Sequence, residues 1–145
     1  MFKHTLIPTD GSPLAEQAVD RGIRLANGFR AQVTLMTVTE PFSVFSLKPL
    51  QLSLTESEYA EAMQQRGRHL LAAGAALAQE LGVPCDPVVI EDEHPYDAII
   101  EVADARGCDL IAMASHGRRG VSALVLGSET QKVLTHCEIP VLVFR

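Results

Sequence analysis

Residues 4–38, HTLIPTDGSPLAEQAVDRGIRLANGFRAQVTLMTV, decide the fold, because they read as a strand, a helix and a second strand in succession. The apolar run at residues 4–8 predicts the first strand. The Ser-Pro pair at 12–13 predicts a helix start, with serine as the N-cap, and the Asn-Gly pair at 27–28 predicts its end. The β-rich residues 33–38 lack clean polar and apolar alternation, which indicates a parallel strand covered on both faces.

The same alternation of helix and strand patterns continues to the end of the chain. Helices are predicted at residues 55–81, 94–107 and 128–136, and strands at residues 87–90, 109–114 and 139–144. Capping boxes mark the starts of the first and last of these helices, at Thr55 and Ser128. The stripe predicted to face inward on the long helix includes Tyr59, Met63, Leu70, Ala73, Leu77 and Leu81. This order predicts one α/β domain over residues 1–145, a doubly wound, five-stranded parallel sheet with helices on both faces.

Residues 39–54 fit neither periodicity. They are rich in large apolar side chains, but Pro41 and Pro49 interrupt both helix and strand patterns. A long, irregular, apolar loop is typical of a lid, a binding surface or a partner surface. The sequence is equally compatible with a segment that simply folds down over the core of its own domain.

Composition and charge exclude several classes of function. The 145 residues are 47% apolar and 21% charged, and the net charge of −6 argues against general binding to nucleic acid or anionic lipid. No apolar run approaches the roughly 18 residues that span a bilayer, and the N-terminus does not resemble a secretory signal. Cys85, Cys108 and Cys137 lack metal-ligand spacing and indicate a reducing compartment, so a cytoplasmic location is expected. Neither a metal site nor a Ser-His-Asp or Cys-His catalytic arrangement can be defined by spacing.

The loop at residues 115–127 carries the strongest indication of ligand binding. Ligands of open parallel sheets bind at the carboxyl ends of the strands, where this loop is expected to lie. It holds three glycines and leads into the helix predicted from Ser128, so its backbone can approach a phosphate and the helix can present free N–H groups. Residues 110–128 also contain Arg118 and Arg119 and no carboxylate, which favours a polyphosphate. Alternatively, the glycines only make turns and the arginines are only solvated.

Asp10, at the end of the first predicted strand, has two interpretations. Its carboxylate can accept hydrogen bonds from ribose hydroxyls, or help to hold a metal ion that is bound to phosphates. An aspartate in the sequence Asp-Gly-Ser is also typical of a turn in which the side chain binds its own backbone. The presence of the glycine-rich loop at the same edge of the sheet favours the first interpretation.

Together these motifs resemble the universal stress protein family over nearly the whole chain. Nucleotide-binding members have a first strand that ends in Pro-Thr-Asp, which matches residues 8–10. They also have a late Gly-x-x-Gly, nine residues, and Gly-Ser or Gly-Thr, whose last glycines match Gly117 and residues 127–128. The first glycine of that pattern is Ala114 here, where an added methyl could crowd the ribose, and the strand at 139–143 also looks like the family. The resemblance implies an adenine nucleotide alpha hydrolase-like, Rossmann-like fold.

The resemblance also implies a ligand and a site. The ligand is an adenine nucleotide, ATP or else ADP or AMP, with Mg²⁺, held on the loop 114–128. Asp10 is implied to bind the ribose, and the backbone of Val38 the adenine. The base pocket is implied to be shaped by Pro8, Thr9 and Met113. The phosphates are implied to meet Gly117, Gly127, Ser128, Glu129 and Thr130, with His116 at the entry of the loop and Arg118 above the phosphates.

Three functions remain open. The first is an ATP-binding regulatory or stress-response domain, which the family resemblance implies to be a homodimer formed through the C-terminal strand. The second is a nucleotide-independent interaction module that engages an unknown protein partner. The third is an enzyme that hydrolyses ATP slowly, with no catalytic residue defined beyond the candidate base His116. Dinucleotide enzymes and P-loop NTPases are disfavoured because neither of their glycine motifs occurs.

Overall fold

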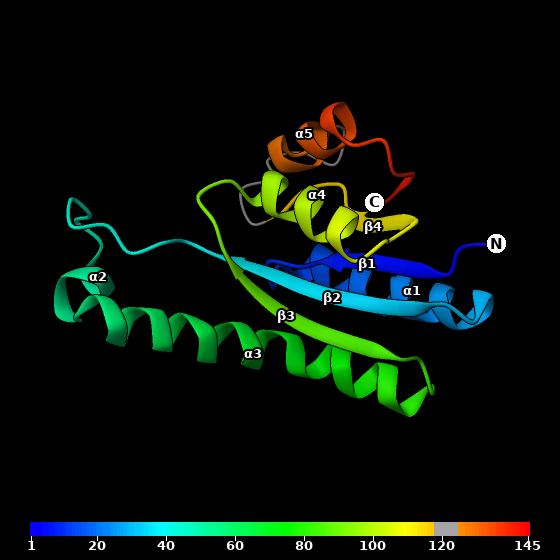
Figure 1. Ribbon diagram of the computed structural model, residues 1–145, viewed down its shortest axis with the longest axis horizontal. Helices are drawn as coiled ribbons and strands as arrows, with labels where there is room; N and C mark the ends of the chain where they lie inside the picture. The colour runs from blue at the N-terminus through cyan, green and yellow to red at the C-terminus, as the bar shows by residue number, and fades with distance from the viewer. Residues whose placement is uncertain (118–124) are drawn as a thin grey trace.

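The computed structural model describes residues 1–117 and 125–145. Strands and helices alternate along the chain, as predicted, and one short additional helix precedes the long one (Figure 1). In chain order the elements are β1 (His4–Pro8), α1 (Pro13–Phe29), β2 (Gln32–Thr39), α2 (Pro49–Ser53), α3 (Glu56–Glu80), β3 (Cys85–Glu91), α4 (Pro95–Ala105), β4 (Leu110–Ala114), α5 (Ser128–His136) and β5 (Val141–Phe144).

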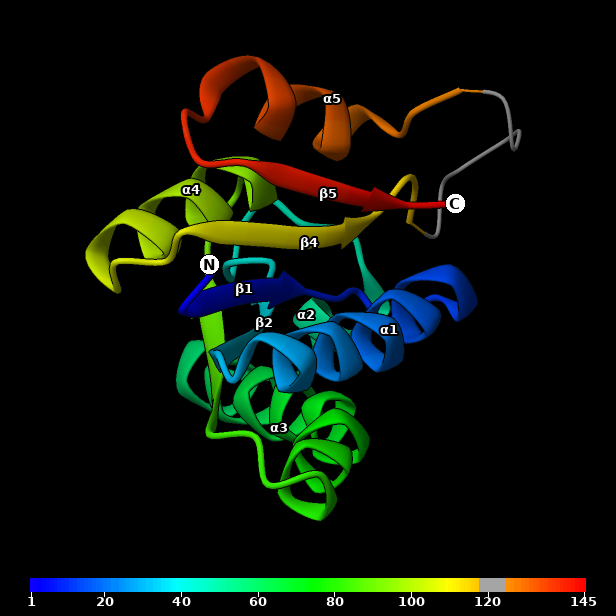
Figure 2. The ribbon, with the colours of Figure 1, turned by 90° about the vertical axis from the view of Figure 1, so that its right-hand side faces the viewer.

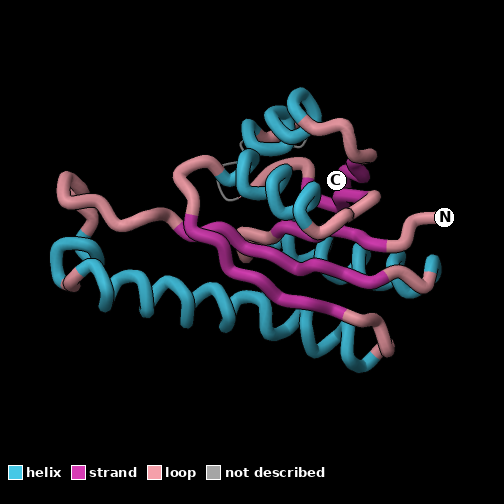
Figure 3. Tube along the Cα trace, viewed as in Figure 1, coloured by secondary structure: helices cyan, strands magenta, loops and turns pink. Residues whose placement is uncertain are grey.

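The five strands form one parallel sheet in the order β3-β2-β1-β4-β5. Helices α1 and α3 pack on one face, and α4 and α5 on the other, so that the sheet is the middle of three layers (Figures 2 and 3). Because the strand order reverses on either side of β1, the carboxyl ends of β1, β2 and β4 meet at a topological switch point. The predicted doubly wound α/β fold is confirmed.

The central strands are buried on both faces, which explains why their sequences do not alternate. In β1, Leu6 belongs to the apolar cluster under α4, and Ile7 belongs to the cluster under α1 and α3. Both side chains are fully buried, as are Leu35 of β2 and Ile111 of β4. A parallel sheet covered by helices on both sides needs apolar residues at consecutive positions.

The end of α1 differs from the expectation. The helix continues through Gly28 to Phe29, and Arg30 adopts the left-handed conformation, with φ of 56°. The backbone N–H of Arg30 donates to the carbonyls of Ala26 and Asn27, which satisfies groups that the helix end would otherwise leave open. The predicted stop at residues 27–28 was wrong because a non-glycine residue takes the left-handed cap two positions later.

The long helix α3 begins as predicted, and every member of the predicted inward stripe except Ala73 is buried or half-buried. Thr55 and Glu58 form the reciprocal capping box. The residues that α3 buries are Tyr59, Gly67, Leu71, Gly74 and Ala78, whereas Ala73 of the predicted stripe is exposed. The two glycines let the helix approach the sheet closely. A Cβ at Gly67 would lie 2.6 Å and 2.7 Å from the two γ-methyls of Val89 on β3.

Gly67→Ala is expected to lower the free energy of unfolding by about 1–3 kcal/mol, because overpacking a tight contact forces neighbouring groups to move. Val89 is β-branched and stiff, and its Cβ would also lie only 3.2 Å from the new methyl group. Gly28→Ala in α1 is the matched control, since a Cβ there meets nothing within 4 Å. The control is expected to stabilise the protein slightly through helix propensity. Chemical denaturation of both variants checks the pair, and equal stability changes would contradict the packing assignment.

Residues 39–54 do not fold down over the core as one interpretation held. Val44, Phe45, Leu47 and Leu52 are between 65% and 90% exposed. Phe42 is the exception and packs edge-on against Tyr59, with ring centroids 5.6 Å apart. The segment leaves the carboxyl end of β2 and returns through α2 to the start of α3 (Figure 1).

The remaining sequence features have simple counterparts in the structure. Cys85, Cys108 and Cys137 are free, and burial raises the pKa of the Cys108 thiol to about 11, so that it behaves as a small apolar side chain. In the described part of the chain, none of the helices has both the length and the apolar character that crossing a membrane requires.

Candidate functional site

A cavity of about 560 Å³ lies where the carboxyl ends of β1, β2 and β4 meet. This volume is within the range of ligand pockets, roughly 300–1,000 Å³. The cavity is the topological switch point at which open α/β sheets bind their ligands. Its lining residues are Pro8, Thr9, Asp10, Ala15, Met36, Thr37, Val38, Thr39, Glu40, Lys48, Asp92, Glu93, Pro95, Ile99, Met113, Ala114, His116, Gly117, Gly127, Ser128, Glu129 and Thr130.

Twelve of the thirteen residues that the sequence singled out line this one cavity, although they span positions 8 to 130. They are Pro8, Thr9, Asp10, Val38, Met113, Ala114, His116, Gly117, Gly127, Ser128, Glu129 and Thr130. The thirteenth, Arg118, lies outside the described residues, as does its neighbour Arg119. The structure therefore brings the predicted site together, and the contact of each residue with a ligand stays a prediction.

The Asp10 carboxylate both forms a turn and borders the cavity. Its Oδ1 accepts a hydrogen bond from the Ser12 N–H at 2.9 Å, which is the turn geometry expected from the sequence. Gly11 has φ of 76°, and its N–H donates to the Thr9 hydroxyl at 3.1 Å. Ser12 in turn accepts from the Ala15 N–H as the predicted N-cap of α1. The two interpretations of Asp10 are thus compatible, because the turn holds the carboxylate at the cavity wall.

Both glycines of the late motif lie where a side chain has no room. A Cβ at Gly117 would lie 2.2 Å from Oδ2 of Asp10. A Cβ at Gly127 would lie 2.9 Å from the α-carbon of His116 and 3.3 Å from the Ser115 carbonyl oxygen. The Gly127 N–H donates to that same carbonyl at 2.7 Å, so the two ends of the loop are joined. Position 127 needs glycine because backbone lies so close, whereas a side chain at position 117 would displace the Asp10 carboxylate.

The N-terminus of α5 differs from the predicted capping box. Gly127, not Ser128, is the N-cap, and Ser128 is the first residue of the helix. The Glu129 carboxylate accepts the Tyr96 N–H at 2.9 Å, which ties α5 to the first turn of α4. The buried Thr130 hydroxyl donates to the Ala114 carbonyl at 2.9 Å. The side chains of Glu129 and Thr130 are therefore engaged with the protein, and it is the backbone N–H groups of this first turn that can meet an anion.

Ala114, which stands at the first glycine of the family motif, packs against small residues of α1. It is 8% exposed and packs in a cluster with Ala15 and Ala18 of α1. Met113, the preceding residue of β4, belongs to the apolar cluster on the opposite face of the sheet. The methyl group of Ala114 packs against the small side chains of α1. The longer side chain of Met113 points to the face of the sheet that α4 covers.

The described lining of the cavity is strongly acidic. Carboxylates come from Asp10, Glu40, Asp92, Glu93 and Glu129, whereas the one lysine or arginine among the described lining residues is Lys48. Within the described residues, no group of three or more His, Cys, Asp or Glu side chains is arranged to hold a metal ion. The net negative charge of these lining residues disfavours a polyphosphate, so polyphosphate binding requires additional positive charge beside them.

The loops after β2 and β3 also lie at this edge of the sheet, and their charged side chains were not among the predicted site residues. The structure puts Glu40, Lys48, Asp92 and Glu93 from these loops in the cavity wall. The carboxyl-end rule was the signal that could have found them, since Glu40 follows β2 and Asp92 follows β3 directly.

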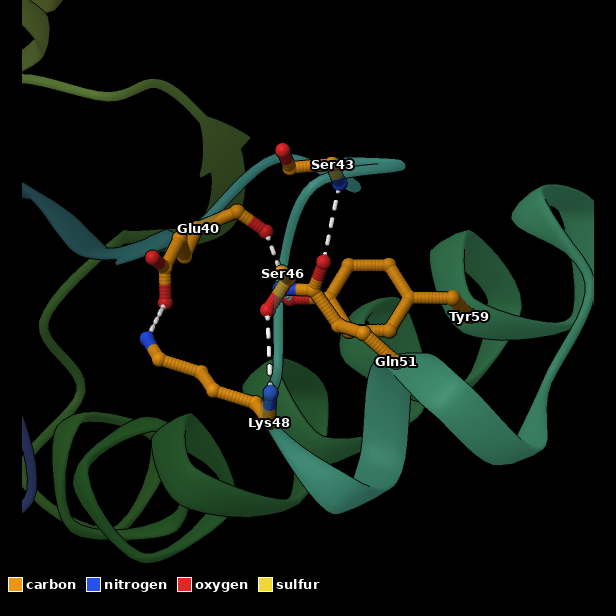
Figure 4. Close-up of polar contacts among 6 residues, drawn as sticks. All are labelled: Glu40, Ser43, Ser46, Lys48, Gln51 and Tyr59. Carbon is orange, nitrogen blue, oxygen red and sulfur yellow. Dashed lines mark hydrogen bonds and ion pairs between the residues drawn. The ribbon is translucent and has the colours of Figure 1, made fainter.

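We call residues 40–54, which connect β2 to α3, the strap. Polar contacts hold its two ends together (Figure 4). The buried Gln51 accepts the Ser43 N–H at 2.8 Å and donates to the Tyr59 hydroxyl at 3.3 Å. The Tyr59 hydroxyl donates to the Glu40 carbonyl at 2.9 Å, and burial together with the Glu40 charge raises the pKa of Tyr59. The hydroxyl thus stays protonated and available as a donor.

Comparison with known proteins gives relatives that share the whole chain. The universal stress protein MJ0531 of Methanocaldococcus jannaschii is 30% identical over 145 residues, which cover 100% of this chain and 83% of the relative. A universal stress protein of Thermus aquaticus, from the QAH/OAS sulfhydrylase 3′ region, is 31% identical over 147 residues and covers 100% of both chains.

Solved structures match the fold. Hypothetical protein MJ0577 superposes with a TM-score of 0.82 at 24% identity, covering 99% of this chain and 95% of its own. A universal stress protein in complex with cAMP has a TM-score of 0.71 at 21% identity, covering 99% and 97%. A universal stress protein family protein from Arabidopsis thaliana with AMP bound has a TM-score of 0.62 at 17% identity, covering 98% and 90%. The model of the Universal stress protein family itself matches residues 1–145, and the chain belongs to this family.

Proposed function

We propose that this protein binds an adenine nucleotide, ATP with Mg²⁺, in the cavity at the switch point, and acts as a cytoplasmic regulatory or stress-response domain. The observation that carries the proposal is the close approach of Gly117 to the Asp10 carboxylate and of Gly127 to residues 115–116. This close approach supports a site in which the Asp10 carboxylate binds the ribose beside a backbone that binds the phosphates. The nucleotides bound by two solved relatives, cAMP and AMP, support the same class of ligand.

Each part of the nucleotide has a counterpart in the cavity. Met113, Ile99 and the β2 residue Val38 offer apolar surface to the base. Asp10 accepts hydrogen bonds from the ribose hydroxyls, and the first-turn N–H groups of α5 bind phosphate oxygens. Mg²⁺ on the phosphates supplies positive charge against the acidic wall of the cavity. We expect hydrolysis to be slow at most, because rapid ATP hydrolysis requires a positioned base and the sequence offers no candidate beyond His116.

Nucleotide analysis of the purified protein tests the proposal. Acid extraction followed by anion-exchange chromatography is expected to release an adenine nucleotide in a ratio approaching one per chain. A protein that carries none, and that takes up none when dialysed against millimolar MgATP, would contradict the proposal and favour the nucleotide-independent module.

Asp10→Ala is expected to weaken ATP binding about tenfold or more, because one or two charge-assisted hydrogen bonds, each about 1.5–3 kcal/mol, are lost. Asp10→Asn is the sharper variant, since its amide oxygen can still accept the Ser12 N–H and preserve the turn. Calorimetric titration of both variants with MgATP measures the effect. If both fold normally and bind ATP like the wild type, Asp10 serves the turn alone.

A second candidate function rests on one observation, the exposure of Val44, Phe45 and Leu47 in the strap. Exposed large apolar side chains that lie together mark interaction surfaces. A regulatory domain that reports nucleotide binding to an unknown protein partner would use both the cavity and the strap. A pure interaction module would use the strap alone.

We also propose a homodimer formed through β5. This strand lies at one edge of the sheet, and its four residues, Val141–Phe144, are all apolar and half-buried. The other edge strand, β3, carries Asp86 and Pro87, which discourage pairing with another strand. A second copy of β5 would satisfy the outer backbone groups of the first.

A further inference from the structure

Lys48 occupies a distinctive position in the cavity wall. It is the N-cap residue of α2, and its ammonium group forms an ion pair with the Glu40 carboxylate across the strap (Figure 4). Both side chains line the proposed nucleotide cavity. They also line a second cavity of about 450 Å³, which lies between the strap and α3. The ion pair therefore stands at the boundary of two cavities and can be reached from both.

The backbone around this ion pair is fixed more firmly than the pair itself. The Tyr59 hydroxyl holds the Glu40 carbonyl, the Ser46 hydroxyl accepts the Lys48 N–H at 3.2 Å, and Gln51 joins the two limbs of the strap. By contrast, the Lys48 and Glu40 side chains are 57% and 58% exposed. Exposed ion pairs contribute little to stability, so the ammonium group can change partners without disturbing the strap.

The charge distribution of the cavity gives Lys48 a role. It is the one ammonium or guanidinium group in the described lining, against five carboxylates. Among the described lining residues, a phosphate group meets carboxylates except at Lys48, and an ammonium group on a flexible stem is well suited to bind it as a point charge. Glu40, the present partner of Lys48, is then the competitor that the phosphate displaces.

On the basis of the function proposed above, we propose that Lys48 is a phosphate-binding residue and that Glu40 weakens nucleotide binding by competing for the Lys48 ammonium group. The Lys48–Glu40 pair consequently makes the affinity depend on the negative charge of the ligand. Triphosphates, which compete best with one carboxylate, gain most from Lys48, and uncharged nucleosides gain nothing. The ligand class is thus a phosphate-rich nucleotide in preference to the nucleoside.

Charge-changing variants titrated with both MgATP and adenosine test this proposal. Lys48→Gln is expected to weaken MgATP binding about tenfold and leave adenosine binding unchanged, since a single charge-assisted bond to phosphate is lost. Lys48→Arg is expected to retain most of the ATP affinity. Glu40→Gln is expected to tighten MgATP binding several-fold by freeing the ammonium group. Lys3→Gln is the matched control, because exposed Lys3 precedes β1 at the opposite end of the sheet and carries the same charge.

The two levels of the proposal fail in different ways. If the wild type binds neither ATP nor adenosine, the nucleotide function and the role of Lys48 are both wrong. If the wild type binds ATP and Lys48→Gln binds it equally well, or no more weakly than Lys3→Gln does, only the role of Lys48 is overturned. The double variant, Glu40→Gln with Lys48→Gln, tests whether Glu40 and phosphate compete for the Lys48 ammonium group. Glu40→Gln should tighten MgATP binding markedly less when Lys48 has already been replaced. An undiminished gain in the double variant would contradict the competition.

Discussion

Gly127→Val abolishes measurable ATP binding while the protein keeps its fold; this is the largest effect we expect from a single substitution. The Cβ of the new residue would lie 2.9 Å from the His116 α-carbon. Because this contact is with the main chain, a change of side-chain rotamer at His116 cannot relieve it. The ends of the loop must separate, which moves the α5 N-terminus from the phosphate position. Losing two or more charge-assisted hydrogen bonds lowers affinity by about a hundredfold or more.

Gly117→Val is expected to have a comparable effect by a different route. Its Cβ would lie 2.2 Å from Oδ2 of Asp10, so the valine displaces the carboxylate that we assign to the ribose. Circular dichroism of both variants should stay near that of the wild type, because the affected loop lies outside the sheet. Gly28→Ala, with nothing near its Cβ, is the control and should bind normally. If both valine variants bind ATP like the wild type, the result favours a nucleotide-independent interaction module instead.

Val143→Pro is expected to convert a dimeric protein into a folded monomer. The carbonyls of Pro140 and Phe144 accept N–H groups of β4, at Ile111 and Ser115. Because successive residues of a strand point to opposite sides, the N–H of Val143 faces the outer edge of β5. Within the described residues no strand pairs with that edge. Proline at this position removes a donor that only a partner would use.

Leu142→Pro provides the contrast, since the N–H of Leu142 lies on the β4 side. This substitution is expected to break the ladder inside the monomer and lower the melting temperature markedly. Light scattering and thermal melting of the two variants separate loss of the dimer from loss of the fold. A wild type that is monomeric at micromolar concentration would refute the dimer outright.

The sequence was a good guide to the order of elements, because local chemistry determines most of it. The capping box at Thr55 and the N-cap at Ser12 appear as expected, since each depends on contacts within a few residues. Consecutive apolar residues in the central strands correctly indicated a sheet covered on both faces. The location of the candidate site was predicted from the rule that ligands of open parallel sheets bind at the carboxyl ends of the strands, and the cavity lies there.

Several features that sequence reasoning missed depend on contacts between separate elements. Gly67 adds nothing to an apolar periodicity, yet α3 approaches the sheet there so closely that a Cβ would lie 2.6 Å from a methyl group of Val89. The Ser128 capping box failed because Gly127 takes the N-cap position, where its N–H donates to the Ser115 carbonyl at the other end of the loop. Lys48 reads as an isolated charge in an apolar loop, and the structure shows that it pairs with Glu40 and lines the cavity.

Isothermal titration of nucleotide-stripped wild-type protein with MgATP and, separately, with adenosine tests the central claim most directly. The account predicts binding of MgATP with one site per chain and binding of adenosine that is weaker by at least about tenfold, because the phosphates make charge-assisted hydrogen bonds that the nucleoside lacks. Equal affinity for the two ligands, or no heat from either, would contradict the assignment of the glycine-rich loop as a phosphate site.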